Sequence, residues 1–317
     1  MLVHKTLLML LKESLNLFSC RRNSLFLRKM KKVSHNKIVL LVTGGLILIA
    51  LVFMYTFLDE AEKYRSTIST SVTVEKTWKL PSVLKEVSGI AFLAPNKLAC
   101  IQDESGSIYI YNLETSILER EIEFAGRGDY EGISIQDNTA YVLESNGTVY
   151  RIKDFLGNAS TEVFKTFFSS KNDTEGLFYE KAGNRLLIAV KAEDPNFDDR
   201  KGIYAVQLPS MQIKRDAVFY LNFEEKVFDD IRKEDLEDTF FPSEVAIDPG
   251  TGEILILEAR EPRLLILAPD GKAKELHVLS RELFPQPEGL TFDASGNLYI
   301  SNEGRPATVH RVKINHK

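Results

Sequence analysis

Two hydrophobic patterns divide this chain. Residues 38–58 form one apolar run without a charged side chain, IVLLVTGGLILIALVFMYTFL. Beyond residue 71 the apolar residues come in short runs, separated by turns that contain Gly, Asn and Asp. The first pattern predicts a single long helix, and the second predicts a series of antiparallel strands.

The apolar run is long enough to cross a membrane. As a helix it would extend roughly 31 Å, against a hydrocarbon core of about 30 Å. Basic residues precede it from Arg21 onward, and acidic residues follow it from Asp59. The positive-inside rule therefore predicts a basic cytoplasmic segment at 1–37, a transmembrane helix at 38–58 and an extracytoplasmic remainder. A buried core helix and a cleaved signal peptide are the alternatives, but a signal peptide has a shorter apolar part that ends at small residues.

A polar segment at residues 59–71 is predicted to be a linker, and one pattern then returns five times. Each copy opens on a Glu-Gly or related pair, enters an apolar strand, and continues through a turn to a second and a third strand. The openings are Val87–Phe92, Tyr130–Ile135, Thr174–Tyr179, Ser243–Asp248 and Pro287–Phe292. Copies one to four add a fourth, more polar segment.

The spacing of the copies predicts the fold. Aligned at Ser88, Glu131, Glu175, Glu244 and Glu288, the copies lie 43, 44, 69 and 44 residues apart. Four strands in about 43 residues are typical of a propeller blade, and the longest interval is too short for two blades. It is better explained by inserts at Glu193–Lys201 and Glu224–Asp238. The sequence therefore predicts an all-β, five-bladed β-propeller over residues 72–317.

The last copy lacks a fourth strand of its own. Residues Ser71–Leu80, SVTVEKTWKL, have strand character and belong to no copy. We expect them to supply the missing outer strand and to close the ring, which removes free sheet edges.

Acidic residues mark two places that a propeller brings together. The first strand of each blade lines the central channel, and the second strand returns antiparallel to it, so its end lies beside the start of the first. The candidate ligands at the starts are Glu131, Glu175, Glu244 and Glu288, and those at the ends are Asp103, Glu144, Glu258 and Glu303. Ser88 replaces the acid in the first copy, and Lys191-Ala192 interrupts the second set.

Carboxylates gathered in this way need compensation. Two of them about 5 Å apart repel by roughly 3 kcal/mol at an effective dielectric constant of 20. Protonation, a buried cationic side chain or a metal ion would offset this repulsion. A set of oxygen donors with almost no histidine favours Ca²⁺ over Mg²⁺. In the alternative interpretation, the glutamates accept hydrogen bonds from neighbouring blades and only hold the ring together.

Three stretches of the sequence carry a family resemblance. They are the EGL and EGI openings, DNTAYVLES with the following VYRI, and PQPEGLTFDASGNLYISNE. Over roughly residues 75–315 the chain resembles the SdiA-regulated family of bacterial membrane-anchored propellers, which is distantly similar to NHL-repeat proteins. The resemblance implies five blades, a calcium site, an N-terminal anchor and no established enzymatic activity. The glutamates that match the motif are Glu131, Glu175, Glu244 and Glu288.

Two functional hypotheses follow. The first is a calcium-binding interaction module outside the bacterial cytoplasmic membrane, with a protein, small molecule or glycan as its ligand. The second is a calcium-dependent hydrolase, similar to a lactonase or phosphoesterase, which needs a base near the metal, commonly His. The three histidines of the repeat region, His277, His310 and His316, are all expected away from the channel mouth. The formal net charge of -5 argues against nucleic acid as a partner.

Overall fold

The computed structural model describes residues 43–55 and 71–316. Residues 43–55, in the middle of the apolar run, are helical with exposed side chains, and they belong to a different compact unit from the repeats. Among the described residues, no helix has both the length and the apolar character that a bilayer span requires. The predicted N-terminal segment, both ends of the predicted span and the linker up to residue 70 lie outside the described residues.

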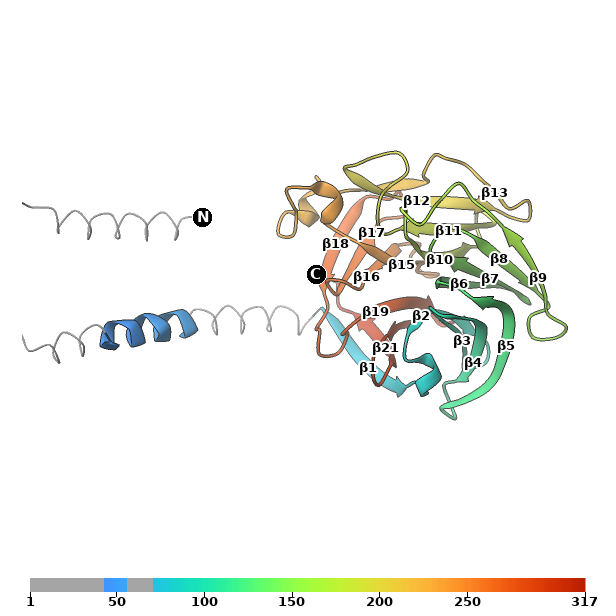
Figure 1. Cartoon of the computed structure of the whole chain (residues 1–317), viewed down its shortest axis with the longest axis horizontal. Coiled ribbons are helices and arrows are strands. Elements are labelled where there is room, and N and C mark those ends of the chain that lie inside the picture. The colour runs from blue at the N-terminus through green and yellow to red at the C-terminus, as the bar shows by residue number, and fades with distance from the viewer. Residues whose placement is uncertain (1–42, 56–70, 317) are drawn as a thin grey trace, which may run out of the picture. The chain divides into compact units, whose positions relative to one another are not determined.

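The repeats form five antiparallel sheets around one axis (Figure 1), which confirms the five-bladed propeller. Blade 1 is β2 (Val87–Leu93), β3 (Lys97–Gln102), β4 (Ser105–Asn112) and β5 (Ile117–Arg127). Blade 2 is β6 (Tyr130–Gln136), β7 (Thr139–Glu144), β8 (Val149–Lys153) and β9 (Ser160–Phe164). Blade 3 is β10 (Thr174–Glu180), β11 (Arg185–Val190) and β12 (Arg200–Gln207), with β13 (Gln212–Ile213) and β14 (Phe219–Asn222) both paired to β12.

Blade 4 is β15 (Pro242–Ile247), β16 (Ile254–Glu258), β17 (Arg263–Leu267) and β18 (Ala273–Val278). Blade 5 is β19 (Pro287–Phe292), β20 (Leu298–Asn302), β21 (Thr308–Ile314) and β1 (Val72–Lys79). The first strands β2, β6, β10, β15 and β19 contact one another in a closed ring. This inner ring places residues from five distant parts of the sequence around one axis.

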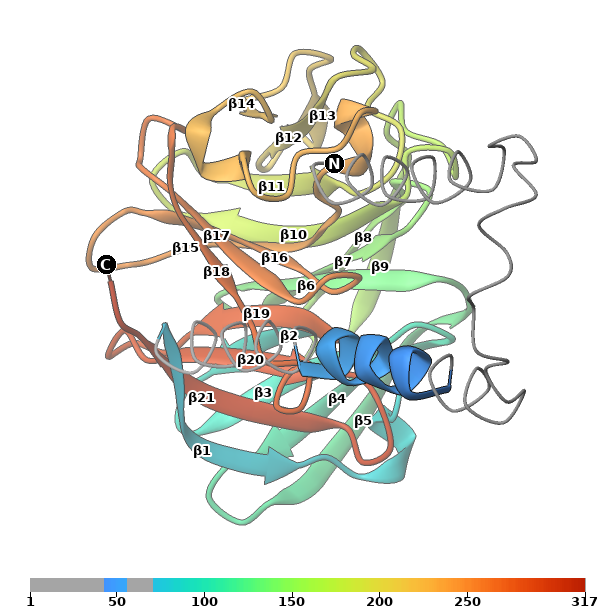
Figure 2. The ribbon, with the colours of Figure 1, turned by 90° about the vertical axis from the view of Figure 1, so that its left-hand side faces the viewer.

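Strand β1 closes the propeller as predicted. It pairs antiparallel with β21, from Val72 opposite Ile314 to Lys79 opposite Thr308 (Figure 2). The indole Nε1 of Trp78 donates a hydrogen bond of 2.6 Å to the carbonyl oxygen of Leu113, so β1 also ties blade 5 to blade 1. The two ends of the repeat region therefore stabilise each other across one sheet.

The turns and the second strands explain why the pattern repeats. In each blade the hairpin after the first strand contains a residue with positive φ, which favours Gly, Asn and Asp. These residues are Asn96, Asp137, Asn184, Gly252 and Gly296. The second strands are buried on both faces between neighbouring blades, so they read as continuous apolar runs rather than alternating ones. Leu98, Ala99, Cys100 and Ile101 of β3, for example, are fully buried.

The long interval is one blade with two inserts, as predicted, and part of the second insert is buried. This insert contains two short 3₁₀ turns, η2 (Lys226–Phe228) and η3 (Leu236–Asp238), and another such turn, η1 (Ser82–Leu84), lies between β1 and β2. Phe228 of η2 is fully buried against Phe223 and Phe240. These phenylalanines pack the acidic insert onto blades 3 and 4.

Candidate cation site at the start of the inner strands

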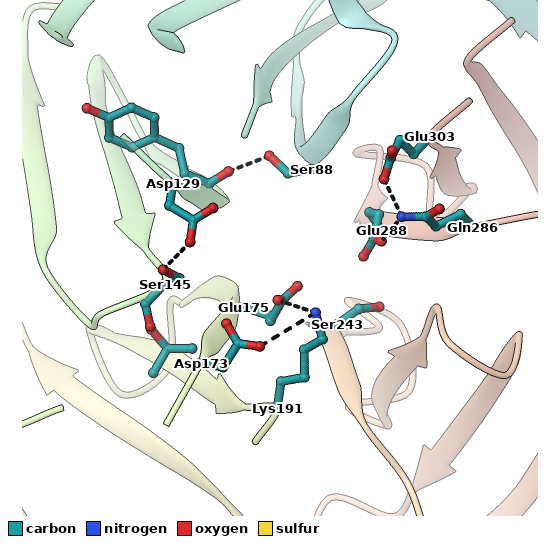
Figure 3. Close-up of polar contacts among 12 residues, drawn as sticks. Ser88, Asp129, Ser145, Asp173, Glu175, Lys191, Ser243, Gln286, Glu288 and Glu303 are labelled. Carbon is teal, nitrogen blue, oxygen red and sulfur yellow. Dashed lines mark hydrogen bonds and ion pairs between the residues drawn. The ribbon is translucent and has the colours of Figure 1, made fainter. Parts of the chain in front are cut away.

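Every inner strand begins with a β-bulge. The pairing between the first and second strands shifts by one residue in all five blades, immediately after the strand begins. The extra residue of a bulge is left out of the ladder, which re-aims its side chain. By position these extra residues are Ser88, Glu131, Glu175, Ser243 and Glu288, which we call the axial ring. Figure 3 shows Ser88, Glu175, Ser243 and Glu288 around the space between the inner strands.

The fourth copy has a different register from the one predicted. Pro242 faces Glu258 and Glu244 faces Leu257, so Ser243 is the bulge residue of blade 4. Glu244 occupies the position that glycine has in the other four blades. Its Oε1 accepts hydrogen bonds from the backbone N–H groups of Leu177 (2.8 Å) and Val245 (2.9 Å). Burial raises the pKa of this carboxyl well above its usual range.

Glycine is needed at that position in the other blades because the next blade lies close. A Cβ on Gly132 would lie 2.6 Å from the Leu177 Cβ and 2.7 Å from the Glu175 carbonyl oxygen. A Cβ on Gly176 would lie 2.8 Å from the backbone nitrogen of Val245. The Glu-Gly motif thus combines a re-aimed carboxylate with a close approach of two inner strands.

Two of the predicted second-strand acids lie away from the axial ring. Glu144 accepts a hydrogen bond of 3.1 Å from the Tyr150 hydroxyl, and Glu258 forms an ion pair of 3.0 Å with Arg263. Both partners belong to the third strand of the same blade. Glu258 is nevertheless only 1% exposed, and burial raises its pKa to about 7 despite the Arg263 guanidinium.

The other two second-strand acids come close to the blade starts. Asp103 and Glu303 follow the last residues of β3 and β20. Burial raises the pKa of both carboxyls, and the next largest cause is Glu86 for Asp103 and Asp103 for Glu303. Glu303 is hydrogen-bonded to Gln286, whose amide also donates to Glu288 Oε1 at 3.1 Å. Asp103 Oδ1 is buried without a hydrogen-bond partner among the described residues.

A second set of acids, not predicted from the sequence, lies at the mouth. Asp129 and Asp173 each stand two residues before a ring glutamate, and Glu86 stands two before Ser88. Asp129 accepts a hydrogen bond of 2.5 Å from the Ser145 hydroxyl (Figure 3). The repeated Asp-x-Glu-Gly spacing was the signal that could have identified Asp129 and Asp173.

Lys191 is the cation in direct contact with a ring carboxylate. Its Nζ lies 2.6 Å from Glu175 Oε1 and 3.7 Å from Asp173 Oδ2 (Figure 3). It occupies the position after the second strand where Asp103, Ser145, Ala259 and Glu303 stand in the other blades. Burial lowers its pKa, but the neighbouring Glu175 and Asp173 outweigh burial and raise it overall.

The ring positions divide into serines that connect blades and glutamates that carry charge. Ser88 Oγ donates to the carbonyl oxygen of Tyr130 at 2.6 Å, and Ser243 Oγ donates to that of Pro287 at 3.2 Å. Each serine therefore ties its blade to the next one. The carboxylate of Glu131 has no hydrogen bond to any other described residue. Within the axial ring the hydrogen bonds between blades therefore come from the serines, whereas Glu244, next to the ring, accepts one from Leu177 of blade 3.

The glutamates of the ring are short of positive charge. Burial, and then the carboxylates of Glu175 and Asp129, raise the pKa of Glu131 to about 10. Burial raises the pKa of Glu175 to about 8 although Lys191 opposes it. Burial likewise raises the pKa of Glu288 to about 7. Near neutral pH the ring therefore binds protons that free glutamates would release.

The donor set fits a hard cation in its chemistry. Its ligands are carboxylate oxygens from separate blades, as Ca²⁺ prefers. In the arrangement described, however, no three His, Cys, Asp or Glu side chains converge on one point within residues 43–55 and 71–316. A metal would have to draw the carboxylates inward. It would also have to compete with the Lys191 ammonium on Glu175.

The histidines of the propeller are not part of this site. His277 lies in β18 and His310 in β21, and both are buried. His310 is hydrogen-bonded to Thr77 and to the carbonyl oxygen of Leu283, and His316 follows the last strand. These positions agree with those expected from the sequence.

Comparison with known proteins identifies the family and the fold. The SdiA-regulated family model matches residues 63–313. No curated protein matches the chain. Among solved structures, glutaminyl cyclase from Myxococcus xanthus is similar at a TM-score of 0.56 and 10% identity, covering 77% of this chain and 96% of the other. Aldose sugar dehydrogenase from Streptomyces coelicolor is similar at a TM-score of 0.48 and 13% identity, covering 77% and 98%. At 10% identity, the likeness to glutaminyl cyclase concerns the fold alone.

Proposed function

The chain belongs to the SdiA-regulated family, and from that premise we propose that it is a calcium-binding interaction propeller anchored outside the bacterial cytoplasmic membrane. The axial ring and the acids beside it bind Ca²⁺. The bound ion holds the inner strands together and shapes the face on which a protein, small molecule or glycan docks. The N-terminal segment lies in the cytoplasm.

One observation carries the calcium proposal: three glutamates from three blades face one axis without enough positive charge to balance them. Their raised pKa values, due first to burial and then to neighbouring carboxylates, are consistent with this imbalance. A divalent cation would replace the protons and offset the repulsion, since opposite charge within a few ångströms favours the ionised form. The Glu131 carboxylate and Asp103 Oδ1 form no hydrogen bond to other described residues, and both could serve as ligands.

The anchor is supported by the sequence around residues 38–58. The described part of that run is helical, and its apolar side chains, such as Leu46, Ile47 and Phe53, are exposed to more than half of their surface. A helix that exposes such apolar side chains is more stable in lipid than in water. The basic residues that precede it orient the propeller away from the cytoplasm.

Calcium titration of the full-length protein in mild detergent tests the proposal. After removal of divalent ions with a chelating resin, we expect CaCl₂ to give a saturable heat of binding and to raise the melting temperature, because the ion binds the folded ring and not the unfolded chain. MgCl₂ is expected to act more weakly because of its stricter geometry. The absence of both heat and a melting shift with CaCl₂ would refute calcium binding.

A separate experiment tests the anchor. Alkaline extraction of membranes should leave the protein in the pellet, and protease added to spheroplasts should remove the propeller. Release by alkali, or protection from the protease, would contradict the proposed location.

A further inference from the structure

We infer that Lys191 is a built-in competitor for the cation of the axial ring: its ammonium group occupies Glu175 until a divalent ion displaces it. The inference rests on the proposed function and adds to it a mechanism that sets the calcium concentration at which the ring responds.

The contact distance makes the two cations compete for Glu175 Oε1. Lys191 Nζ lies 2.6 Å from Glu175 Oε1, and the Glu175 side chain is only 5% exposed. A calcium ion binds carboxylate oxygen at about 2.3–2.6 Å, which is the distance at which the ammonium already lies. An ion that takes Glu175 Oε1 as a ligand must therefore displace the ammonium, and an ion on the other carboxylate oxygen would be repelled by the ammonium a few ångströms away.

The backbone around Lys191 is held, while its side chain has room to move. The ammonium of Lys201, which is 1% exposed, donates hydrogen bonds to the carbonyl oxygens of Lys191 (2.6 Å) and Ala192 (2.5 Å). The Lys191 N–H donates to the carbonyl oxygen of Asp173 at 2.9 Å. The Lys191 side chain itself is 34% exposed. It can therefore rotate toward solvent without disturbing β11.

The other blades show that the fold does not require a lysine here. The equivalent positions hold Asp103, Ser145, Ala259 and Glu303. Two of these residues add negative charge to the mouth, and two are neutral. Only blade 3 places an ammonium at this position, beside a glutamate and an aspartate that would otherwise favour a metal. Its effect is to lower the fraction of molecules whose ring is open to calcium, and hence the apparent affinity.

Calcium titration calorimetry on the full-length protein in detergent tests this inference with three variants. Lys191→Met removes the ammonium and keeps most of the side-chain volume. Lys191→Arg keeps the positive charge. Lys171→Met is the matched control, because Lys171 is an exposed lysine two residues before Asp173 with no ring contact. It removes the same charge from the neighbouring loop, whose Lys171 carbonyl oxygen accepts a hydrogen bond from the Glu193 N–H.

We expect Lys191→Met to bind Ca²⁺ about tenfold or more tightly, since the ring no longer has to open first. Lys191→Arg should bind no more tightly than the unaltered protein, and Lys171→Met within about twofold of it. Equal affinity of Lys191→Met and the unaltered protein would overturn the inference and leave the proposed function standing. If neither binds calcium, the proposed function fails. Binding by Lys191→Met alone would support the inference.

A second measurement uses the unaltered protein, so it does not depend on whether a variant folds. Reductive methylation followed by mass spectrometry reports how accessible each lysine ammonium is in the unaltered protein. Saturating calcium should increase the labelling of Lys191 several-fold and leave that of Lys171 unchanged. Labelling of Lys191 that falls or stays constant while calcium binds would show that the ammonium remains on Glu175.

Discussion

Replacing Glu131 by Gln should stabilise the calcium-free propeller at alkaline pH. Burial and the neighbouring acids raise the pKa of this carboxyl to about 10 in the folded protein, against an ordinary value of 4.5. A carboxyl with a raised folded pKa contributes its full stability below the unfolded pKa and loses it as the pH rises toward the folded pKa. The loss therefore begins near pH 5 and continues through pH 8.

The size of the effect follows from the two pKa values. At pH 8 the unfolded chain has released this proton, while the folded ring retains it. This pH lies about 3.5 units above the pKa of 4.5 in the unfolded chain. At about 1.4 kcal/mol per unit, the upper limit is about 5 kcal/mol. Because the charges of Glu175 and Glu288 contribute to this raised pKa and these two groups bind protons themselves, we expect a smaller value of about 2 kcal/mol. Glutamine has no proton to retain and avoids this cost.

Thermal melts at pH 5 and pH 8 in calcium-free buffer provide the assay. For a domain of this size, about 2 kcal/mol corresponds to a shift of roughly 4–8 °C. Glu131→Gln should melt close to the unaltered protein at pH 5 and at least about 4 °C higher at pH 8. It should also gain less from added calcium, because one ligand is lost. Glu121→Gln, at an exposed position of β5, is the control and should show no such difference.

Two results of these melts would refute the prediction. If Glu131→Gln is less stable than the unaltered protein at pH 8, the Glu131 carboxylate is stabilised in the folded ring. An identical difference at both pH values would mean that the effect of the substitution does not arise from charge.

Two further predictions concern the scaffold around the ring. Gly132→Ala should cost about 1–3 kcal/mol in urea unfolding, since its Cβ would meet blade 3 at 2.6 Å. Gly126→Ala, with no atom within 4 Å of its Cβ, should change stability by less than about 0.5 kcal/mol, and equal effects would contradict the close-approach argument. Arg263→Met should cost about 3–5 kcal/mol because it leaves the buried Glu258 without its cation. The loss should be smaller at pH 5 than at pH 8, since a protonated Glu258 needs no partner, and a loss independent of pH would contradict this.

The sequence predicted the propeller because each blade is a complete local unit. Strand, turn and strand recur at a fixed period, and each blade shows the same order of apolar runs and left-handed turn residues. The closing strand was also predictable, since Ser71–Leu80 had strand character and no partner in its own copy. These features depend on patterns of several residues, which tolerate an error of one position.

The site was harder to predict because it depends on single positions. At the bulge, a shift of one residue changes the direction of a side chain, and chemical similarity aligned Glu244 with glutamates that correspond to Ser243. The same sensitivity separates Glu144 and Glu258, which contact third strands, from Asp103 and Glu303, which stand one position later. Nothing in the local sequence shows that Lys191 reaches Glu175.

Blade 4 shows that the bulge and the carboxylate are separate features. It has neither a ring glutamate nor the following glycine, yet its inner strand begins with the same shift in pairing, with Ser243 bonded to the next blade. Blade 1 does the same with Ser88. The fold can therefore form the bulge with an uncharged residue that connects two blades. Glu131, Glu175 and Glu288 give up that hydrogen bond and accept the cost of burying charge, which is expected if those three positions are retained for a cation rather than for the stability of the propeller alone.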